Sequence, residues 1–140
     1  MKSLKLAAVL VLLALFLVPT SSFSAESIDP SALSAAEGFL NLLDDSEYQL
    51  AWSQTSVVNQ TYIGYPEWFR KTLAVRPHLG QMLERTLAKT SHHNSWGGLP
   101  DGDYVRISFS TRFLNKADSL ETVVLIREGS FWSVSGYYLR

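Results

Sequence analysis

The chain has 140 residues, of which 46% are hydrophobic and 18% are charged. This is the size of one folded domain rather than two, and the composition excludes a disordered chain. Twelve basic and thirteen acidic residues give a net charge of −1, without the basic excess typical of nucleic-acid-binding proteins. Cysteine is absent, which excludes disulfides, thiolate metal sites and cysteine nucleophiles, and the sequence carries no strong catalytic motif.

The N-terminus has the pattern of an export signal. Lys2 and Lys5 precede an unbroken apolar run over residues 6–18. A membrane-spanning helix needs about 20 apolar residues, so this shorter run favours the hydrophobic region of a signal peptide. Small side chains at Ser22 and Ser24 predict cleavage before Ala25, with an uncleaved N-terminal anchor as the alternative.

Residues 1–24 are therefore predicted to be a signal peptide, and residues 25–140 a single domain. Cleavage removes two lysines and leaves ten basic and thirteen acidic residues, a net charge of −3. The absence of disulfides fits a bacterial periplasmic or secreted protein better than a small eukaryotic secreted one. After cleavage no stable membrane anchor is expected.

Helical signals fill the first half of the mature chain. Asp29 as a cap and Pro30 at the first helical position predict a helix start, and one helix face is formed by Leu33, Ala36, Leu40 and Leu43. A short second helix is expected near residues 46–54. A polar, β-branched connection follows over 55–65, and a third helix is predicted from Pro66 to Pro77.

The second half has the texture of strands. Residues 81–92 lack a helical stripe, and 94–102 hold three glycines and a proline, as expected of a long hairpin loop. Residues 104–113 alternate strictly, with Val105, Ile107, Phe109, Thr111 and Phe113 on one face. Residues 120–127 are apolar at nearly every position, which predicts a central strand.

A tight turn at Glu128-Gly129 leads into a last strand over 131–139, whose residues Trp132, Val134 and Gly136 are expected to face the core. Helices followed by strands predict an α+β fold. Its N-terminal helices would pack on a curled four-stranded antiparallel meander sheet.

Several short segments, in order along the chain, resemble a small secreted bacterial family known as domain of unknown function 4019. The resemblance covers roughly residues 32–140 and is carried by residues 76–80, Arg85, residues 99–104, residues 121–123 and residues 131–138. It implies a cone-shaped α+β fold like that of nuclear transport factor 2 or cystatin. It implies no activity, because the family supplies no catalytic or binding residues.

His92 and His93 are the most metal-like pair in the sequence. Neighbouring residues of a strand point to opposite faces, so the two rings cannot share one metal unless the strand has ended. Asp101 and Asp103 lie across the predicted hairpin, and a His–carboxylate site is conceivable. A solvated hairpin end is the favoured interpretation, and neither a metal nor another cofactor is expected.

Aromatic residues suggest a pocket between the helices and the concave sheet. Trp52, Trp68 and Trp132 are candidates to line it, with Tyr137 as one of the hydroxyls that orient a ligand. Plain core packing is the alternative. Trp96 lies in the glycine-rich loop and is expected to be exposed as a contact residue for a partner.

Charged residues on the strands allow two interpretations. Arg106 and Arg112 share a polar face and would pair with Glu121 as a surface ladder. A buried pair of Arg85 or another arginine with Glu121 at a pocket mouth would instead bind an anionic ligand. The candidate ligand-binding residues are Trp52, Trp68, Arg85, Glu121 and Tyr137.

The leading functional hypothesis is an exported, non-catalytic module that binds an unidentified small molecule or an envelope protein. One alternative is a pocket enzyme of the ketosteroid-isomerase type, which needs a pocket carboxylate as a base. The strand over 104–113 has no acid and the next strand offers only Glu121 before its end, so an enzyme is not expected. The other alternative is an envelope-associated structural or interaction protein.

Overall fold

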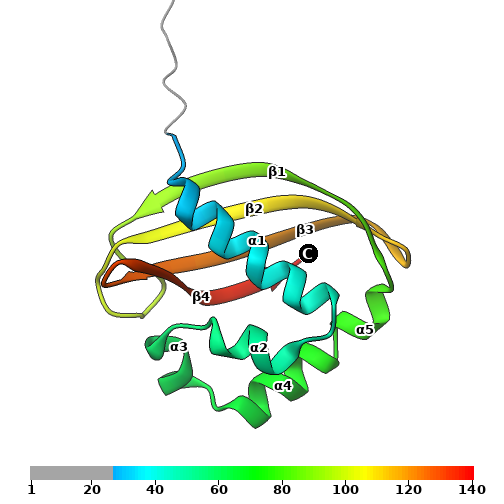
Figure 1. The fold of residues 1–140 in the computed structure, drawn as a ribbon, viewed down its shortest axis with the longest axis horizontal. Coiled ribbons are helices and arrows are strands. Elements are labelled where there is room, and N and C mark those ends of the chain that lie inside the picture. The colour runs from blue at the N-terminus through cyan, green and yellow to red at the C-terminus, as the bar shows by residue number, and fades with distance from the viewer. Residues whose placement is uncertain (1–26) are drawn as a thin grey trace, which may run out of the picture.

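The computed structural model describes residues 27–140, so the predicted signal peptide over 1–24 lies outside the described residues. Five helices precede four strands along this part of the chain (Figure 1). The helices are α1 (Pro30–Asp44), α2 (Tyr48–Ser53), α3 (Val57–Tyr62), α4 (Tyr65–Leu73) and α5 (Arg76–Leu79). The strands are β1 (Met82–His93), β2 (Tyr104–Phe113), β3 (Lys116–Glu128) and β4 (Phe131–Leu139).

The four strands form one antiparallel sheet in the order β1-β2-β3-β4. The predicted α+β fold, with N-terminal helices and a four-stranded meander, is confirmed. None of the helices between residues 27 and 140 has the length and apolarity needed to span a membrane.

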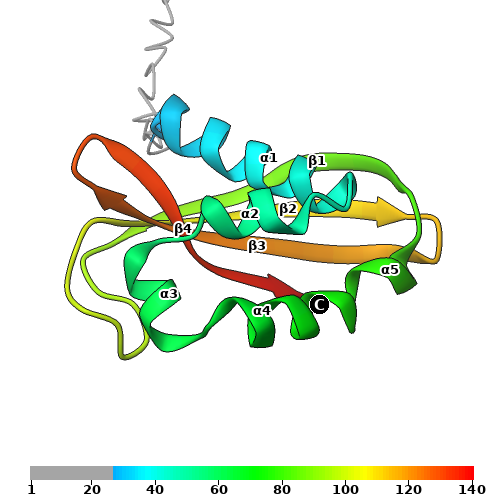
Figure 2. The ribbon, with the colours of Figure 1, turned by 60° about the horizontal axis from the view of Figure 1, so that its bottom comes forward.

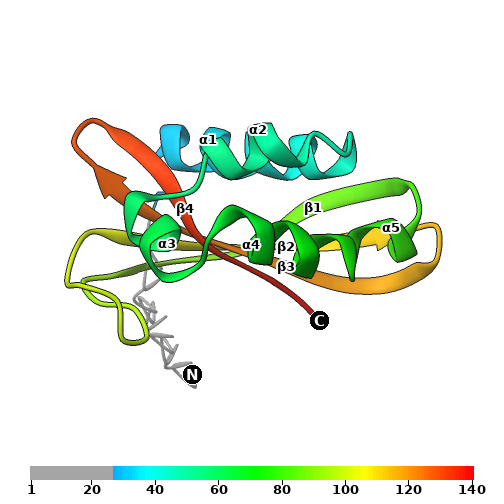
Figure 3. The ribbon, with the colours of Figure 1, turned by 90° about the horizontal axis from the view of Figure 1, so that it is seen from below.

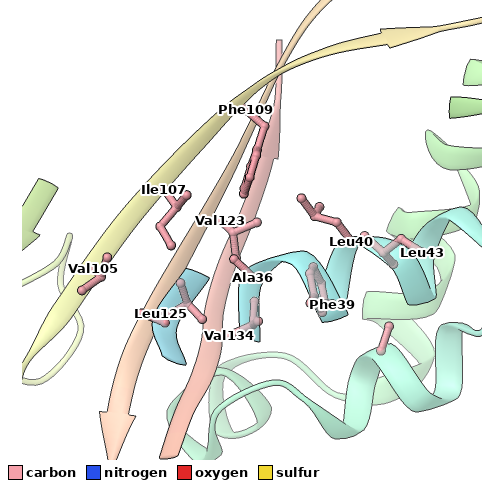
Figure 4. Close-up of a cluster of buried hydrophobic side chains, with 12 residues drawn as sticks. Ala36, Phe39, Leu40, Leu43, Val105, Ile107, Phe109, Val123, Leu125 and Val134 are labelled. Atoms are coloured by element: carbon pink, nitrogen blue, oxygen red, sulfur yellow. The ribbon is translucent and has the colours of Figure 1, made fainter. Parts of the chain in front are cut away.

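Helix α1 crosses one face of the sheet and forms the core with it (Figures 1 and 4). Its start is as predicted, because the Asp29 carboxylate accepts a hydrogen bond from the backbone N–H of Ser31 at 2.8 Å and Pro30 begins the helix. Its buried residues are Ala32, Ala36, Phe39, Leu40 and Leu43. Leu33, expected in this stripe, is only half-buried at its margin.

The strand β2 contributes the predicted face to this core. Val105, Ile107 and Phe109 are buried against α1 together with Val123 and Leu125 of β3 (Figure 4). The strand β3 is buried at nearly every position of its central part, as expected of a central strand covered on both faces.

A second, smaller cluster covers one end of the opposite face. Tyr104, Val124 and Ile126 are buried there under Trp96 and Leu99 of the long loop. Trp96 is therefore half-buried, and the expectation that it is exposed is wrong. Tyr104 begins the otherwise polar face of β2, and the long loop packs on its ring and accepts a hydrogen bond from its hydroxyl at the Pro100 carbonyl.

A β-bulge changes the phase of β4. Val124 pairs with Gly136 whereas the next residue, Leu125, pairs with Val134, so Ser135 is an extra residue in the strand. Trp132 and Val134 face α1 as predicted, but beyond the bulge Tyr137 takes the core position. The prediction that Gly136 faces the core is wrong, because one inserted residue reverses every side chain after it.

The segment between α2 and β1 is more helical than predicted. Residues 57–62 form α3, since the Ser56 hydroxyl accepts a hydrogen bond from the N–H of Asn59 at 3.0 Å and caps the helix. The expected helix over 66–77 is divided into α4 and α5. Pro77 lies in the first turn of α5, where its missing N–H is tolerated, so it helps to begin a helix rather than end one.

Candidate functional site

A hollow of about 410 Å³ lies between α3, α4 and β4. We call it the β4 hollow; Figures 2 and 3 show the two helices running alongside that strand. Apolar atoms make most of its wall, and the apolar side chains there are Phe39, Ile63, Trp68, Val75, Val134 and Leu139. The polar side chains at its margin include Thr55, Asn59, Lys71 and Thr72. Volumes of about 300–1,000 Å³ with mainly apolar walls are typical of small-molecule sites.

Two features of the chain keep this hollow open. The edge of β4 is tied to the segment before α3, because the Val134 N–H donates to the Gln54 carbonyl at 2.9 Å and the Ser56 N–H donates to the Val134 carbonyl at 2.8 Å. Helix α4 has no fully buried residue. It is held to α2 by aromatic contacts, so it stands beside β4 without filling the space between them.

These aromatic contacts form a layer between α2 and α4. The ring centroids of Trp52 and Trp68 lie 5.5 Å apart, those of Tyr48 and Phe69 lie 5.9 Å apart, and the Tyr65 ring stacks on that of Phe69 at 5.5 Å. Each ring is half-buried. Trp68 also reaches the β4 hollow, whereas Trp52 lies behind it and supports its ring.

Arg76 and Tyr137 form the polar end of the β4 hollow. The Arg76 Nη1 donates to the Tyr137 hydroxyl at 3.1 Å, and the hydroxyl in turn donates to the Glu121 Oε1 at 2.9 Å. Both side chains thus connect the hollow to a cluster of charges beneath it.

The centre of this buried charge cluster is the carboxylate of Glu121, which has no exposed surface. Its Oε1 accepts from Arg76 at 2.8 Å as well as from Tyr137. Its Oε2 accepts from the Arg85 Nε at 2.7 Å and from the Thr111 hydroxyl at 2.6 Å. Four donors from α5, β1, β2 and β4 therefore converge on one side chain of β3, and both oxygens are fully engaged.

Asp44, at the end of α1, is the second anion of the cluster. It accepts hydrogen bonds from Arg85 at 2.7 and 3.1 Å and forms an ion pair with Arg76. Two guanidinium groups thus meet two carboxylates, and the cluster is electrically balanced. A buried charge is tolerated only when it is paired and hydrogen-bonded in this way.

The protonation states follow from this arrangement. Burial by itself lowers the pKa of the Arg85 guanidinium, but hydrogen bonds and charges from Asp44 and Glu121 outweigh it and hold the pKa above its ordinary value. Burial raises the pKa of the Tyr137 phenol, and the negative charge of Glu121 raises it further. At neutral pH the arginine is charged and the tyrosine is a neutral donor.

The structure divides the five sequence-derived candidates between two places. Trp68 and Tyr137 line the β4 hollow, and Trp52 supports Trp68. Arg85 and Glu121 lie in the buried charge cluster and do not line that hollow. Only Tyr137 belongs to both.

The proposed surface ladder with Glu121 is wrong. Arg112 instead pairs with Glu84 at 3.3 Å on the exposed side of the sheet, and Arg106 lies on that same side. Arg106 and Arg112 occupy alternate positions of β2 that point away from α1, whereas Glu121 points toward it. Glu121 instead forms the buried pair with Arg85.

Sequence reasoning missed Arg76 and Asp44 as members of the cluster. The sequence places Arg76 near the end of the helix predicted from Pro66 to Pro77 and indicates no partner for Asp44. One signal was available: Thr111 interrupts a row of apolar core positions in β2, and a buried hydroxyl in such a row requires a polar partner.

The histidines lie apart from both places. His92 is exposed, and the His93 ring makes a hydrogen bond with the Ser91 hydroxyl at 2.8 Å and an edge contact with Trp96 at 5.1 Å. Asp103 pairs with Arg127 at 3.5 Å. Within residues 27–140 no group of three or more metal-binding side chains comes together.

Comparison with curated proteins finds no match to the chain. Residues 35–137 match the family described as protein of unknown function (DUF4019). The matched region contains every member of the buried charge cluster, from Asp44 to Tyr137, and nearly the whole wall of the β4 hollow. The chain therefore belongs to the DUF4019 family, as its sequence segments had indicated.

Proposed function

We propose that this protein is a non-catalytic binding domain that holds a small, largely apolar molecule in the β4 hollow. The observation that carries the proposal is the hollow itself, a space of about 410 Å³ with mainly apolar walls and a polar end. Burial of apolar ligand surface in such a space stabilises a complex by about 25 cal/mol per Å² before the costs of association.

Arg76 supplies a donor for one polar group of that molecule. Its Nη1 and Nη2 atoms bind Glu121, Tyr137 and Asp44, whereas its Nε–H makes no hydrogen bond among the described residues. Because the guanidinium charge is already balanced, the hollow favours a neutral acceptor such as a carbonyl or hydroxyl oxygen over a second full charge. The ligand is thus an apolar body with one acceptor.

The same contacts support binding rather than catalysis. No aspartate or glutamate lines the described wall of the β4 hollow. Glu121, which binds Arg76 and Tyr137 of that wall, already accepts four hydrogen bonds and has no exposed surface. A general base must reach the proton that it abstracts, and this carboxylate is enclosed.

We further propose that the protein acts outside the cytoplasm after removal of residues 1–24. The basic start, the apolar run over 6–18 and the small residues Ser22 and Ser24 support this. N-terminal sequencing of protein from the periplasm or medium is expected to begin at Ala25. Recovery of a chain that starts at Met1 in the membrane fraction would contradict it.

Binding to the β4 hollow is tested with a neutral naphthalene ketone dye whose fluorescence rises in apolar surroundings. Thr72 lines the hollow, and its hydroxyl donates to the Trp68 carbonyl at 2.9 Å. Thr72→Phe is expected to weaken dye binding about tenfold or more, because the larger ring fills part of the hollow. A tenfold loss of affinity corresponds to about 1.4 kcal/mol of binding free energy.

Thr61→Phe is the matched control. Thr61 also lies on a short helix and donates to the carbonyl four residues earlier, Val57, at 2.8 Å, but it is exposed and lies outside the hollow. Its substitution is expected to leave the dye affinity within about twofold. Absence of saturable binding, or equal losses in the two variants, would refute the proposed site.

A further inference from the structure

The face of the sheet opposite α1 carries a second hollow, which meets the β4 hollow at the end of β4. It encloses about 650 Å³ and we call it the open-face groove. Its side chains include Trp96, Arg106, Leu120, Thr122, Tyr138 and Arg140. Two cationic residues and no carboxylate side chain line it, although the whole chain has a net charge of −1.

The guanidinium groups of the two arginines of the groove have no carboxylate partner in the part of the chain that the structure describes. Among residues 27–140, neither Arg106 nor Arg140 forms a side-chain ion pair. By contrast, Arg112 pairs with Glu84, and Arg127 pairs with both Asp29 and Asp103. Unpaired guanidinium groups that line a groove attract anions.

The sheet register sets the spacing of these cations. Arg106 lies opposite Val124 of β3, and Arg140 exchanges backbone hydrogen bonds with Leu120 of the same strand at 2.9 and 3.1 Å. Four residues along β3 correspond to about 13 Å, and two steps between strands to about 10 Å. The two side chains therefore start about 16 Å apart, at opposite ends of the groove.

Tyr138 lies between these ends. It pairs with Thr122, and its side chain is half-exposed. A side chain at Gly136 would approach the Tyr138 ring to 3.1 Å, so the ring lies over the glycine, along the surface of the sheet. Glycine at this position permits the close approach and leaves the other side of the ring open to a ligand.

These features limit what the groove can bind. An extended peptide that adds a strand would pair along the outer edge of β4, because β2 and β3 are paired on both sides. Such a peptide would not cover Arg106, which lies two strands away on β2. Recognition must use the guanidinium groups, which bind carboxylate and phosphate in bidentate fashion, and the apolar face of the tyrosine ring.

We propose that the open-face groove binds an acidic polysaccharide. Anionic groups at two positions of the sugar chain contact Arg106 and Arg140, whose backbones lie about 16 Å apart, and the apolar face of an intervening sugar ring packs on Tyr138. The groove shares Tyr137, Tyr138 and Leu139 with the wall of the β4 hollow, but its two arginines line the groove alone.

The test measures binding of tetragalacturonate by calorimetry, with its methyl ester as a neutral probe of the same shape. Tetragalacturonate is expected to bind saturably, and its affinity is expected to fall as the salt concentration is raised, because salt screens exposed charges. The ester is expected to bind at least about tenfold more weakly, since hydrogen bonds to charged groups contribute about 1.5–3 kcal/mol.

Variants assign the site. Arg106→Gln and Arg140→Gln are each expected to weaken binding of the acid about tenfold. Arg112→Gln, on the same strand face but paired with Glu84 outside the groove, is the control and is expected to stay within about twofold. Tyr138→Phe is expected to retain binding and Tyr138→Ala to lose it.

The proposal is overturned by three results: no saturable binding of tetragalacturonate, equal binding of the ester, or equal losses in the Arg106 and Arg112 variants. Tighter binding of hexaglutamate than of the saccharide would also overturn it, in favour of an acidic peptide. So would binding to anionic vesicles without binding to the saccharide. Thermal melting of each variant separates loss of binding from loss of folding. Dye binding in the β4 hollow tests the other proposal separately in the Arg106 and Arg140 variants, because neither arginine lines that hollow.

Discussion

Glu121→Gln is expected to lower the free energy of unfolding by about 3–5 kcal/mol. The neutral amide no longer balances the guanidinium groups of Arg76 and Arg85, whose side chains are 4% and 8% exposed. It also presents an N–H₂ group where one carboxylate oxygen had accepted two hydrogen bonds. Both effects leave buried charges and donors without partners, and Asp44 alone cannot balance two cations. Urea denaturation followed by circular dichroism measures the change.

Glu84→Gln provides the matched control, because Glu84 also pairs with an arginine of the sheet. That pair is exposed, with Glu84 at 62% and Arg112 at 51%, and its atoms lie 3.3 Å apart. Exposed ion pairs contribute about 0–1 kcal/mol, so the control is expected to lose less than about 1 kcal/mol. If both variants lose similar amounts of unfolding free energy, the buried Glu121 cluster stabilises the fold no more than an exposed ion pair does.

Phe39→Ala is expected to cost about 3–5 kcal/mol of unfolding free energy. The Phe39 side chain is 1% exposed and packs from α1 against the sheet (Figure 4). Its ring also contacts that of Tyr137 edge-on, with 6.0 Å between centroids. The substitution removes the buried ring and leaves a void that α1 cannot close without moving off β4.

Phe131→Ala makes the same chemical change at an exposed site. Phe131 begins β4 with 75% of its surface exposed, so its removal is expected to change the unfolding free energy by no more than about 0.5 kcal/mol. Both variants are measured by the same urea denaturation. A loss below about 1 kcal/mol for Phe39→Ala would mean that α1 does not anchor the core.

Local patterns were sufficient for the elements whose burial is one-sided and regular. The Asp29–Pro30 start and the apolar spacing of α1 marked a helix, and the strict alternation of β2 marked a strand with one core face. The continuous apolar run of β3 marked a central strand. In α1 and β2 the apolar side chains recur with the period of the element, 3.6 residues for a helix and 2 for a strand, so the sequence alone predicts them.

Hydrophobic periodicity gave wrong predictions where an inserted residue shifted a strand or where a helix had no buried face. The bulge at Ser135 reversed the end of β4 and exchanged Gly136 for Tyr137 on the core face. The polar residues of α3 gave no apolar stripe, since that short helix has no buried residue. Its position comes from backbone hydrogen bonds to the edge of β4, which any residue type can make.

In the candidate site, too, the sequence indicated some of the residues, and only the fold showed which partners they have. Residue type alone was enough to single out Arg85, Glu121 and Tyr137, because arginine, glutamate and tyrosine on predicted strands need partners if they are buried. Which partners they find was settled only by the folded chain: Asp44 and Arg76 reach the same carboxylate and guanidinium groups from the end of α1 and from α5. Charges pair through space over a few ångströms, whereas sequence patterns report on neighbours along the chain, and Arg76 and Glu121 are 45 positions apart.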